Sequence, residues 1–265
     1  MHTSALRNLS SWSRGLALGL AATSSLAIVA PSMTRADWWH THLVESQSCD
    51  RDPVFAPDAK PYGHTYEAWA IRYLQWGIAF PATANPAADN VPPETGQSGR
   101  VWFLPSVTGD RTVTRQLSVP AHTPLLVAAL SIRTNNTECP VDTELTVEEL
   151  TARTEELWST ALEASVTIDG QVVAGLEDLQ TSPYLVQTGP FPFTLSDHDN
   201  QLAASGLTCV PDGATIEPNV ARGLFLMIKP LSIGRHTVRI VGIAGPPEDP
   251  AFVKDVTYEI EVVAG

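Results

Sequence analysis

The sequence predicts a mainly β protein, an antiparallel β-sandwich of immunoglobulin-like or jelly-roll-like type with two amphipathic helices packed on it. Three observations favour this class. The 265 residues include 21 prolines and 17 glycines spread along the chain, which favours many short strands joined by turns. The C-terminal segments alternate apolar and polar residues with period two, as half-buried strands do. Apolar residues recur with helical spacing near residues 65–77 and 146–162.

The first 36 residues have the composition of a signal peptide. Two arginines precede an apolar run from Leu16 to Val29, and Thr34-Arg35-Ala36 places small residues at the two positions that a signal peptidase inspects. The run is shorter than the roughly 20 residues that span a membrane. We therefore expect cleavage after Ala36 and a soluble protein secreted to the periplasm or the exterior, with an uncleaved anchor as the alternative.

The chain is strongly acidic, with a formal net charge of −13 at pH 7, and loss of residues 1–36 would take this charge to about −16. Nucleic acids and anionic membranes bind basic surfaces, so neither is an expected partner. No cofactor is predicted, and the oligomeric state is left open. After an irregular lead-in over residues 37–61, we expect residues 62–265 to form a single domain with a sizeable core.

Residues 62–81, YGHTYEAWAIRYLQWGIAFP, hold the densest aromatic cluster in the chain. Thr65 can cap a helix here, and four rings then follow at offsets of three, four and three, on one helical face. This face has two interpretations: either it packs on a β-sheet, or its rings line a groove for a sugar-like or apolar ligand. In the second interpretation the ligand-binding residues are Tyr62, Tyr66, Trp69, Trp76 and Trp102.

Three strand candidates follow this helix. Residues 101–104 form a short, fully apolar run, the pattern of a strand buried on both faces. Residues 112–119 alternate, residues 124–132 are mostly apolar, and only four residues separate the two segments. We therefore expect these two strands to pair antiparallel, with the second deeper in the core.

The second half of the chain predicts one helix and a series of strands. Thr146 and Glu149 form a capping box at the start of the second amphipathic helix, and Asp169-Gly170 is a favoured two-residue hairpin turn. His236 lies on the core-facing alternation of a later strand, which predicts a packed, hydrogen-bonded histidine. The closing strands are expected at residues 223–229, 235–242 and 252–263.

Four stretches of sequence carry a resemblance. They are YGHTYEAWAIRYLQWGIAFP, Asn85-Pro86 with Asp89, GQSGRVWFLPS and TRQLSVPAHTPLLVAAL. Together they resemble a family of uncharacterised exported bacterial proteins whose motifs read roughly YGxxYxEWxxRWWxW, GQxGxVWFL and VPAG. The match covers residues 62–132 well and the rest of the chain more weakly. The resemblance implies a shared fold and export, and it implies no mechanism.

This sequence departs from the family pattern at several positions. Tyr73 and Leu74 stand where tryptophans are usual, and His122 stands where the glycine of VPAG is usual. Two cysteines common in the family, one before GQ and one before VPAG, are absent. Their joint absence suggests that the two form a disulfide in the family and that this chain does without it.

The chain has its own three cysteines, Cys49, Cys139 and Cys209. Exported proteins usually oxidise their thiols, so one disulfide and one remaining cysteine are expected. We favour the pair Cys139 and Cys209, because both lie in polar stretches beside strand-like segments. The sequence leaves the pairing open.

The segment SDHDNQ clusters oxygen atoms as a calcium loop would, through Asp197, Asp199 and Asn200. It lacks the glycine and the distal glutamate of an EF-hand, and such clusters are common in ordinary turns. No metal is therefore predicted, and these three residues are kept as calcium candidates.

Three classes of function remain open at this point. The first is non-catalytic binding of a glycan or a small apolar molecule through the aromatic surface. The second is an exported hydrolase or lyase with His64, Glu67 and His122 as candidate catalytic residues, although Glu67 also suits the ordinary role of a negative charge at a helix N-terminus. The third is a structural or assembly component of the cell envelope. Because no serine-histidine-acid signature, phosphate loop, zinc spacing or nucleotide fingerprint is present, the binding class leads.

Overall fold

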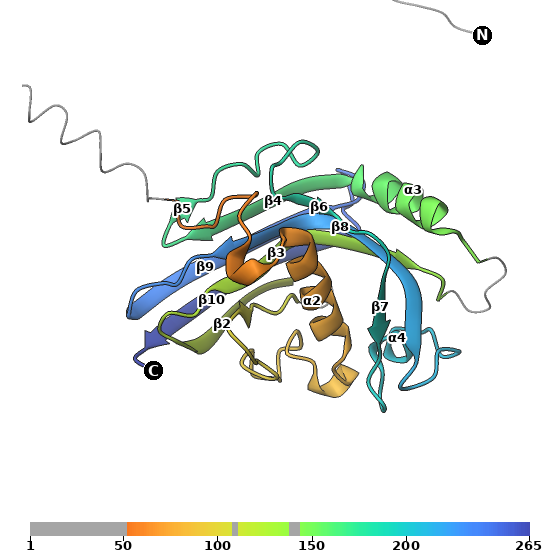
Figure 1. Ribbon diagram of the computed structural model, residues 1–265, viewed down its shortest axis with the longest axis horizontal. Coiled ribbons are helices and arrows are strands. Elements are labelled where there is room, and N and C mark those ends of the chain that lie inside the picture. The colour runs from red at the N-terminus through yellow and green to blue at the C-terminus, as the bar shows by residue number, and fades with distance from the viewer. Residues whose placement is uncertain (1–51, 108–110, 138–143) are drawn as a thin grey trace, which may run out of the picture. The chain divides into compact units, whose positions relative to one another are not determined.

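The computed structural model describes residues 52–107, 111–137 and 144–265 (Figure 1). The predicted signal over residues 1–36 and most of the lead-in lie outside the described residues. Of the lead-in, residues 52–61 are described, and residues 53–55 run beside the end of strand β8, where Phe55 N donates to Met227 O at 2.8 Å. None of the helices in the described ranges is long and apolar enough to cross a bilayer.

The strands of the described chain form two five-stranded β-sheets (Figure 1). The first sheet has the order β1-β3-β8-β6, with β7 also paired to β8: β1 (Trp102–Phe103), β3 (Leu125–Asn135), β8 (Thr215–Ile228), β6 (Leu185–Gln187) and β7 (Phe191–Thr194). The second has the order β2-β10-β9-β4-β5: β2 (Arg111–Pro120), β10 (Phe252–Val263), β9 (Gly234–Ala244), β4 (Ala161–Ile168) and β5 (Gln171–Val172). The pairs β1/β3 and β2/β10 are parallel, and the other pairs are antiparallel. The predicted mainly β sandwich with added helices is therefore confirmed.

One hydrophobic core joins the two sheets. Strand β10 contributes a buried side chain at every second position, at Val256, Tyr258, Ile260 and Val262. Strand β3 is buried at every position from Leu125 to Leu130. The two strands differ because β3 is in contact both with strands of the second sheet and with helices, so both of its faces are covered. The second face of β10 is polar.

The two predicted amphipathic helices are present as α2 (Tyr66–Ile78) and α3 (Val147–Trp158). The Thr65 side chain accepts a hydrogen bond from Ala68 N, and Thr146 with Glu149 forms a complete capping box. Helix α3 ends before the predicted residue 162, because the segment from residue 161 onward alternates with period two and pairs with β9 instead. Three shorter helices are η1 (Pro61–Gly63), η2 (Ala82–Ala84) and α4 (Gln201–Ala204).

The hairpin at Asp169-Gly170 is confirmed: both residues have positive φ, 49° and 81°, and they join β4 to β5. The predicted antiparallel pairing of residues 112–119 with residues 124–132 is wrong. These segments, β2 and β3, lie in different sheets, with β2 parallel to β10 and β3 antiparallel to β8. The apolar first half of β3 needs cover on both faces, so the four-residue link, in which His122 has a φ of 65°, carries the chain from one sheet to the other.

A lysine side chain lies inside the core. Lys254 projects from the inward face of β10, is 3% exposed, and donates from Nζ to the carbonyl oxygen of Ala128 at 2.8 Å. That carbonyl lies where β3 shifts its register against β8. Burial lowers the pKa of the Lys254 ammonium to about 7. One inward position of β10 is therefore occupied by an amine that is hydrogen-bonded to the backbone, whereas the inward positions that follow it carry apolar side chains.

Candidate functional site

The aromatic face of α2 packs against the first sheet. Tyr66 and Trp69 are each 6% exposed, and Tyr73 is buried with them. The Trp69 ring meets Phe103 edge to face at 6.4 Å between centroids, and the Tyr73 ring meets Phe225 of β8 at 6.1 Å. Such edge-to-face contacts add to the free energy gained by burial. The packing interpretation of this face is the one that its geometry supports.

The four rings on this face of α2 are Tyr66, Trp69, Tyr73 and Trp76, and the polar atom of each has a hydrogen-bond partner. Tyr66 Oη donates to Phe55 O at 2.9 Å and accepts from Met227 N, while Trp69 Nε1 donates to Pro61 O at 3.0 Å. Tyr73 Oη donates to Leu104 O at 2.8 Å, and Trp76 Nε1 donates to Gly96 O at 3.1 Å. Burial raises the pKa of both tyrosine hydroxyls well above its ordinary value. The rings therefore fasten neighbouring segments to the helix.

The other predicted ligand-binding residues are more accessible. Tyr62 is 42% exposed, and Trp76 and Trp102 are half-buried. Trp102 Nε1 is buried and has no hydrogen-bond partner among the described residues. Ligand binding by this set stays a hypothesis, and for Tyr66 and Trp69 it would require the packed rings to leave the core.

The motif residues that carry the family resemblance have structural partners. Asn85 Nδ2 donates to Gly77 O at 3.0 Å near the end of α2, and its Oδ1 accepts from Ala87 N. A Cβ atom at Gly96 would lie 2.3 Å from the Phe80 ring, so this close contact requires glycine there. Gln97 pairs with Phe103 in both directions, accepting from its N at 2.9 Å and donating to its O at 2.7 Å. The Gln97 amide thus stands where a neighbouring strand would continue beside β1.

Arg115 completes this network from β2. Its guanidinium is buried and donates to three backbone carbonyls of the loop before β1, at Pro86 (2.5 Å), Ala88 (2.9 Å) and Val91 (2.8 Å). Arginine suits this role because its planar fork carries five N–H donors. The loop over residues 85–97 is therefore held beside β2.

The structure describes all three predicted catalytic residues. Glu67 Oε1 accepts from Gly189 N at 2.8 Å, the His64 ring lies edge to face with Trp69, and His122 is exposed in the link after β2. Among the described residues, no hydrogen bond or ion pair joins any two of the three. Glu67 thus fastens the β6–β7 connection to the start of α2.

The calcium candidates use their oxygen atoms within the protein. Asp199 Oδ2 accepts from Thr83 N and Thr83 Oγ1. These hydrogen bonds, chiefly the one from the Thr83 hydroxyl, hold the pKa of the Asp199 carboxyl below its usual value. Asn200 caps α4 through Oδ1, and Asp197 Oδ1 lies 2.6 Å from His198 Nδ1. The part of the chain that the structure describes contains no group of three or more acidic, histidine or cysteine side chains arranged to hold a metal ion. Of the cysteines, only Cys209 is described, so its pairing with Cys139 stays a prediction.

Three polar side chains that sequence reasoning did not combine meet at one end of the second sheet. His236 Nδ1 lies 2.7 Å from Asp169 Oδ2, and His236 Nε2 lies 3.2 Å from Ser232 Oγ, as in a serine-histidine-acid triad. Nε2 is also 2.9 Å from the carbonyl oxygen of Ser232, which can only accept. A proton on Nε2 would be donated to that carbonyl, whereas a proton on Nδ1 would be donated to Asp169 and would leave Nε2 to accept from the Ser232 hydroxyl. The cluster ties two loops together, and His236 is hydrogen-bonded as predicted.

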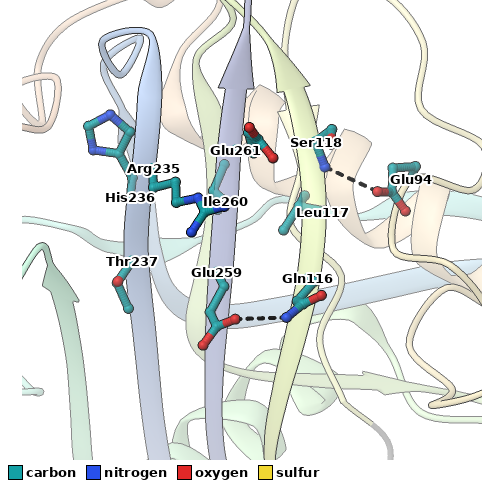
Figure 2. Close-up of a pocket in the computed structure, with 10 residues that line it drawn as sticks. All are labelled: Glu94, Gln116, Leu117, Ser118, Arg235, His236, Thr237, Glu259, Ile260 and Glu261. Atoms are coloured by element: carbon teal, nitrogen blue, oxygen red, sulfur yellow. Dashed lines mark hydrogen bonds between the residues drawn. The ribbon is translucent and has the colours of Figure 1, made fainter.

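A hollow of about 550 Å³ lies on the outer face of the second sheet (Figure 2). Its lining comes from β2, β9, β10 and the loop before β1: Glu94, Gln116, Leu117, Ser118, Arg235, His236, Thr237, Glu259, Ile260 and Glu261. The strand register arranges the polar side chains in two rows, Thr237–Glu259–Gln116 and Arg235–Glu261–Ser118. Gln116 Nε2 donates to Glu259 Oε2 at 3.0 Å, and Glu94 Oε1 accepts from Ser118 N at 3.1 Å, as the dashed lines in Figure 2 show.

A second hollow of about 670 Å³ adjoins the first. It is lined by residues 89–93 of the loop and by residues 113–116 of β2, so Gln116 belongs to both hollows. β2 is the edge of its sheet and is ten residues long, whereas the strands β1, β5, β6 and β7 have between two and four residues. Sheet edges are usually kept short or covered, since their free backbone groups pair readily with other chains.

Sequence reasoning missed this region for an identifiable reason. The charged residues that alternate along residues 252–263 were recognised as the outer face of a strand, and Glu259 and Glu261 are among them. Their neighbour β2 was assigned to β3 instead of β10. Without the correct pairing, the two rows of the hollow are not visible in the sequence.

Comparison of the chain with protein-family models, with curated proteins and with solved structures gives no match. The resemblance to a family of exported bacterial proteins therefore stays a prediction.

Proposed function

We propose that this chain is an exported, non-catalytic binding protein whose ligand occupies the hollows around β2, on the outer side of the second sheet. The observation that carries the proposal is the position of the two hollows, which lie on either side of the Gln116 side chain along the long edge strand. Ligand sites generally combine a concave surface of several hundred Å³ with a few convergent polar groups. Both features occur together here.

The chemistry of the lining supports a polar ligand that carries hydrogen-bond donors. The first hollow presents the carboxylates of Glu94, Glu259 and Glu261 against one guanidinium, from Arg235. Carboxylates accept hydrogen bonds and attract positive charge. Cationic groups and sugar hydroxyls therefore suit this surface better than an apolar molecule does.

The non-catalytic part of the proposal rests on hydrogen-bond accounting. His236 lines this hollow, with Nδ1 beside Asp169 and Nε2 within hydrogen-bond distance of both the carbonyl and the hydroxyl oxygen of Ser232. The candidates His64, Glu67 and His122 have separate surroundings. Efficient proton transfer needs a base within hydrogen-bond reach of the proton that it takes, and no hydrogen bond joins any two of His64, Glu67 and His122 in the described chain.

The test is a screen of the purified protein against a glycan array and a peptide library, followed by calorimetric titration of the hits. The double variant Glu259→Gln with Glu261→Gln is expected to weaken binding about tenfold or more, equivalent to about 1.4 kcal/mol. The control is Glu148→Gln with Glu156→Gln on α3, which changes the net charge equally and lies outside both hollows. This control is expected to bind like the wild type.

Two results would contradict the proposal. Equal weakening in both double variants would show that binding depends on the overall charge of the protein and not on the hollow. Binding that survives in the hollow variant but is lost on Trp76→Leu would return the ligand to the aromatic surface of α2.

A further inference from the structure

Building on the proposed binding function, we propose that the ligand is an extended peptide segment of basic character, which adds to the second sheet as a strand along the free edge of β2.

The edge presents backbone groups in the right direction. In a parallel pair, alternate residues of a strand turn their N–H and C=O groups to the same side. Ser118 N donates to Glu94 and so points away from β10, and Thr112, Thr114 and Gln116 share that direction by alternation. Across the described residues, no other strand and no loop backbone bonds to Thr114 or Gln116 on this side. The edge therefore offers unfilled donors and acceptors at strand spacing.

The protein already closes sheet edges with side chains at two places. The Gln97 amide takes the place of a strand beside Phe103, and the Glu94 carboxylate takes the place of a peptide carbonyl beside Ser118. Figure 2 shows Glu94 reaching β2 from the side opposite β10. In the part of the chain that the structure describes, no side chain is hydrogen-bonded to the outward backbone groups of Thr114 and Gln116, and the 670 Å³ hollow opens at that stretch of the strand. An incoming strand would thus continue the row of contacts that Glu94 begins.

Charge selects the occupant. Glu94, Glu259 and Glu261 lie beside the edge, and the whole chain carries a formal charge of −13. A second copy of this chain would bring the same carboxylates against their counterparts, and like charges that face each other are repelled. A glycan lacks the alternating donors and acceptors of a peptide backbone. A peptide with lysine or arginine at alternate positions satisfies the edge and pairs with the carboxylates, as strand addition requires.

The experiment uses an eight-residue peptide in which lysine alternates with valine, together with its glutamate analogue and an N-methylated form of the lysine peptide. Amide hydrogen exchange is measured by NMR on the full-length protein. Saturation with the lysine peptide is expected to slow exchange at Thr114 and Gln116 at least tenfold. The glutamate analogue and the N-methylated form are expected to leave both amides unchanged, because the first is repelled and the second cannot pair.

A matched pair of variants isolates the backbone contribution. Gln116→Pro removes the outward N–H and leaves the ladder to β10 intact, since proline is tolerated at edge positions whose N–H faces outward. This variant is expected to lose the lysine peptide, whereas Gln116→Thr is expected to keep it. Circular dichroism checks the fold of the proline variant, and the N-methylated peptide supplies the same comparison on the wild type if that variant fails to fold.

The outcomes separate this inference from the proposed function. A glycan or other ligand that needs Glu259 and Glu261 but leaves Thr114 and Gln116 exchanging freely overturns the inference and keeps the function. Slow exchange at these amides without peptide, together with a dimer in solution, overturns it in favour of a second copy. Equal binding of the lysine and glutamate peptides overturns the charge argument, and failure of every ligand in both experiments overturns both proposals.

Discussion

The aromatic face of α2 and the free edge of β2 differ in how their polar groups are paired. Tyr66, Trp69 and Tyr73 are buried, and each donates from its ring to a backbone carbonyl of a neighbouring segment. Thr114 and Gln116 stand on an exposed strand edge with backbone groups that no described strand or loop backbone pairs. One region has completed its contacts within the chain, and the other has not.

This difference shows why a conspicuous sequence feature is a poor guide to a binding site. Large rings at helical spacing attract attention, yet buried rings with satisfied polar atoms have little left to offer a ligand. An edge strand of threonine, glutamine and serine is inconspicuous, and its capacity for new contacts lies in the backbone. The comparison predicts that substitutions at α2 change stability and that substitutions around β2 change binding.

The largest expected effect is the loss of a ring from α2. Trp69→Ala removes the contact with Phe103 and the hydrogen bond to Pro61, and it leaves a cavity. We expect the free energy of unfolding to fall by about 4 kcal/mol, as for other large aromatic truncations in cores. Urea denaturation measures this change.

Tyr62→Ala is the control, because Tyr62 is 42% exposed and should change stability by less than about 0.5 kcal/mol. If Trp69→Ala left stability unchanged and removed ligand binding, α2 would be the binding region in place of the β2 edge.

A smaller loss of stability is expected on substitution of Arg115, the buried charged residue that holds the loop beside the β2 edge. Arg115→Met removes three hydrogen bonds to the loop that flanks the β2 edge. Hydrogen bonds from charged donors are strong individually, but freed carbonyls can turn to water, so we expect a loss of about 3 kcal/mol. Amide exchange over residues 86–97 should accelerate well before the sheet opens.

Arg235→Met, at an exposed position of the outer face, is the control and should leave exchange in that loop unchanged. An Arg115→Met variant whose loop exchanges at the wild-type rate would mean that Glu94 and Gln97 hold the loop without the guanidinium.

Lys254 tests how a buried polar group that is paired within the chain affects the stability of the sandwich core. Its pKa is lowered from 10.5 to about 7 by burial, so between these two values the unfolded chain binds more protons and wild-type stability rises with pH. Lys254→Met removes the titration and the buried charge. We expect the variant to be more stable than the wild type by roughly 2 kcal/mol at pH 6, as when other buried ionic groups are replaced.

That advantage should shrink as pH rises towards 10. It should then reverse, because the neutral amine keeps its hydrogen bond to Ala128 O and methionine leaves that carbonyl unpaired. Denaturation series at pH 6, 8 and 10 measure the trend. An advantage that does not change with pH would show that the folded and unfolded chains bind the same number of protons, so that burial does not lower the pKa of the Lys254 ammonium.

Local features of this fold were readable from the sequence, and its long-range pairing was not. Thr65, the Thr146 and Glu149 capping box, and Asp169-Gly170 act within a few residues, so their chemistry determines their structure directly. The partner of β2 depends on the burial of β3 and on a strand more than a hundred residues later in the chain.

The candidate site inherits that difficulty. Glu259 and Glu261 were readable as outward-facing residues of a strand. Their alignment with Gln116 and Ser118 follows only from the parallel register of β2 with β10. A one-residue slip in that register would turn every side chain of β2 to the other face. Sites built across strands therefore need the pairing before the chemistry can be read.

The smallest expected effect sharpens the comparison most. Glu259→Gln with Glu261→Gln removes two exposed negative charges that lie on the same strand near Glu94. Stability should change by less than about 0.5 kcal/mol, in the stabilising direction at low salt, because like charges are separated by solvent and the effect is screened. Raising the salt concentration to 1 M should remove the gain. Urea denaturation at both salt concentrations measures it, and a loss of stability above about 1 kcal/mol would mean that these carboxylates hold the sheet together, as the rings of α2 hold their neighbours.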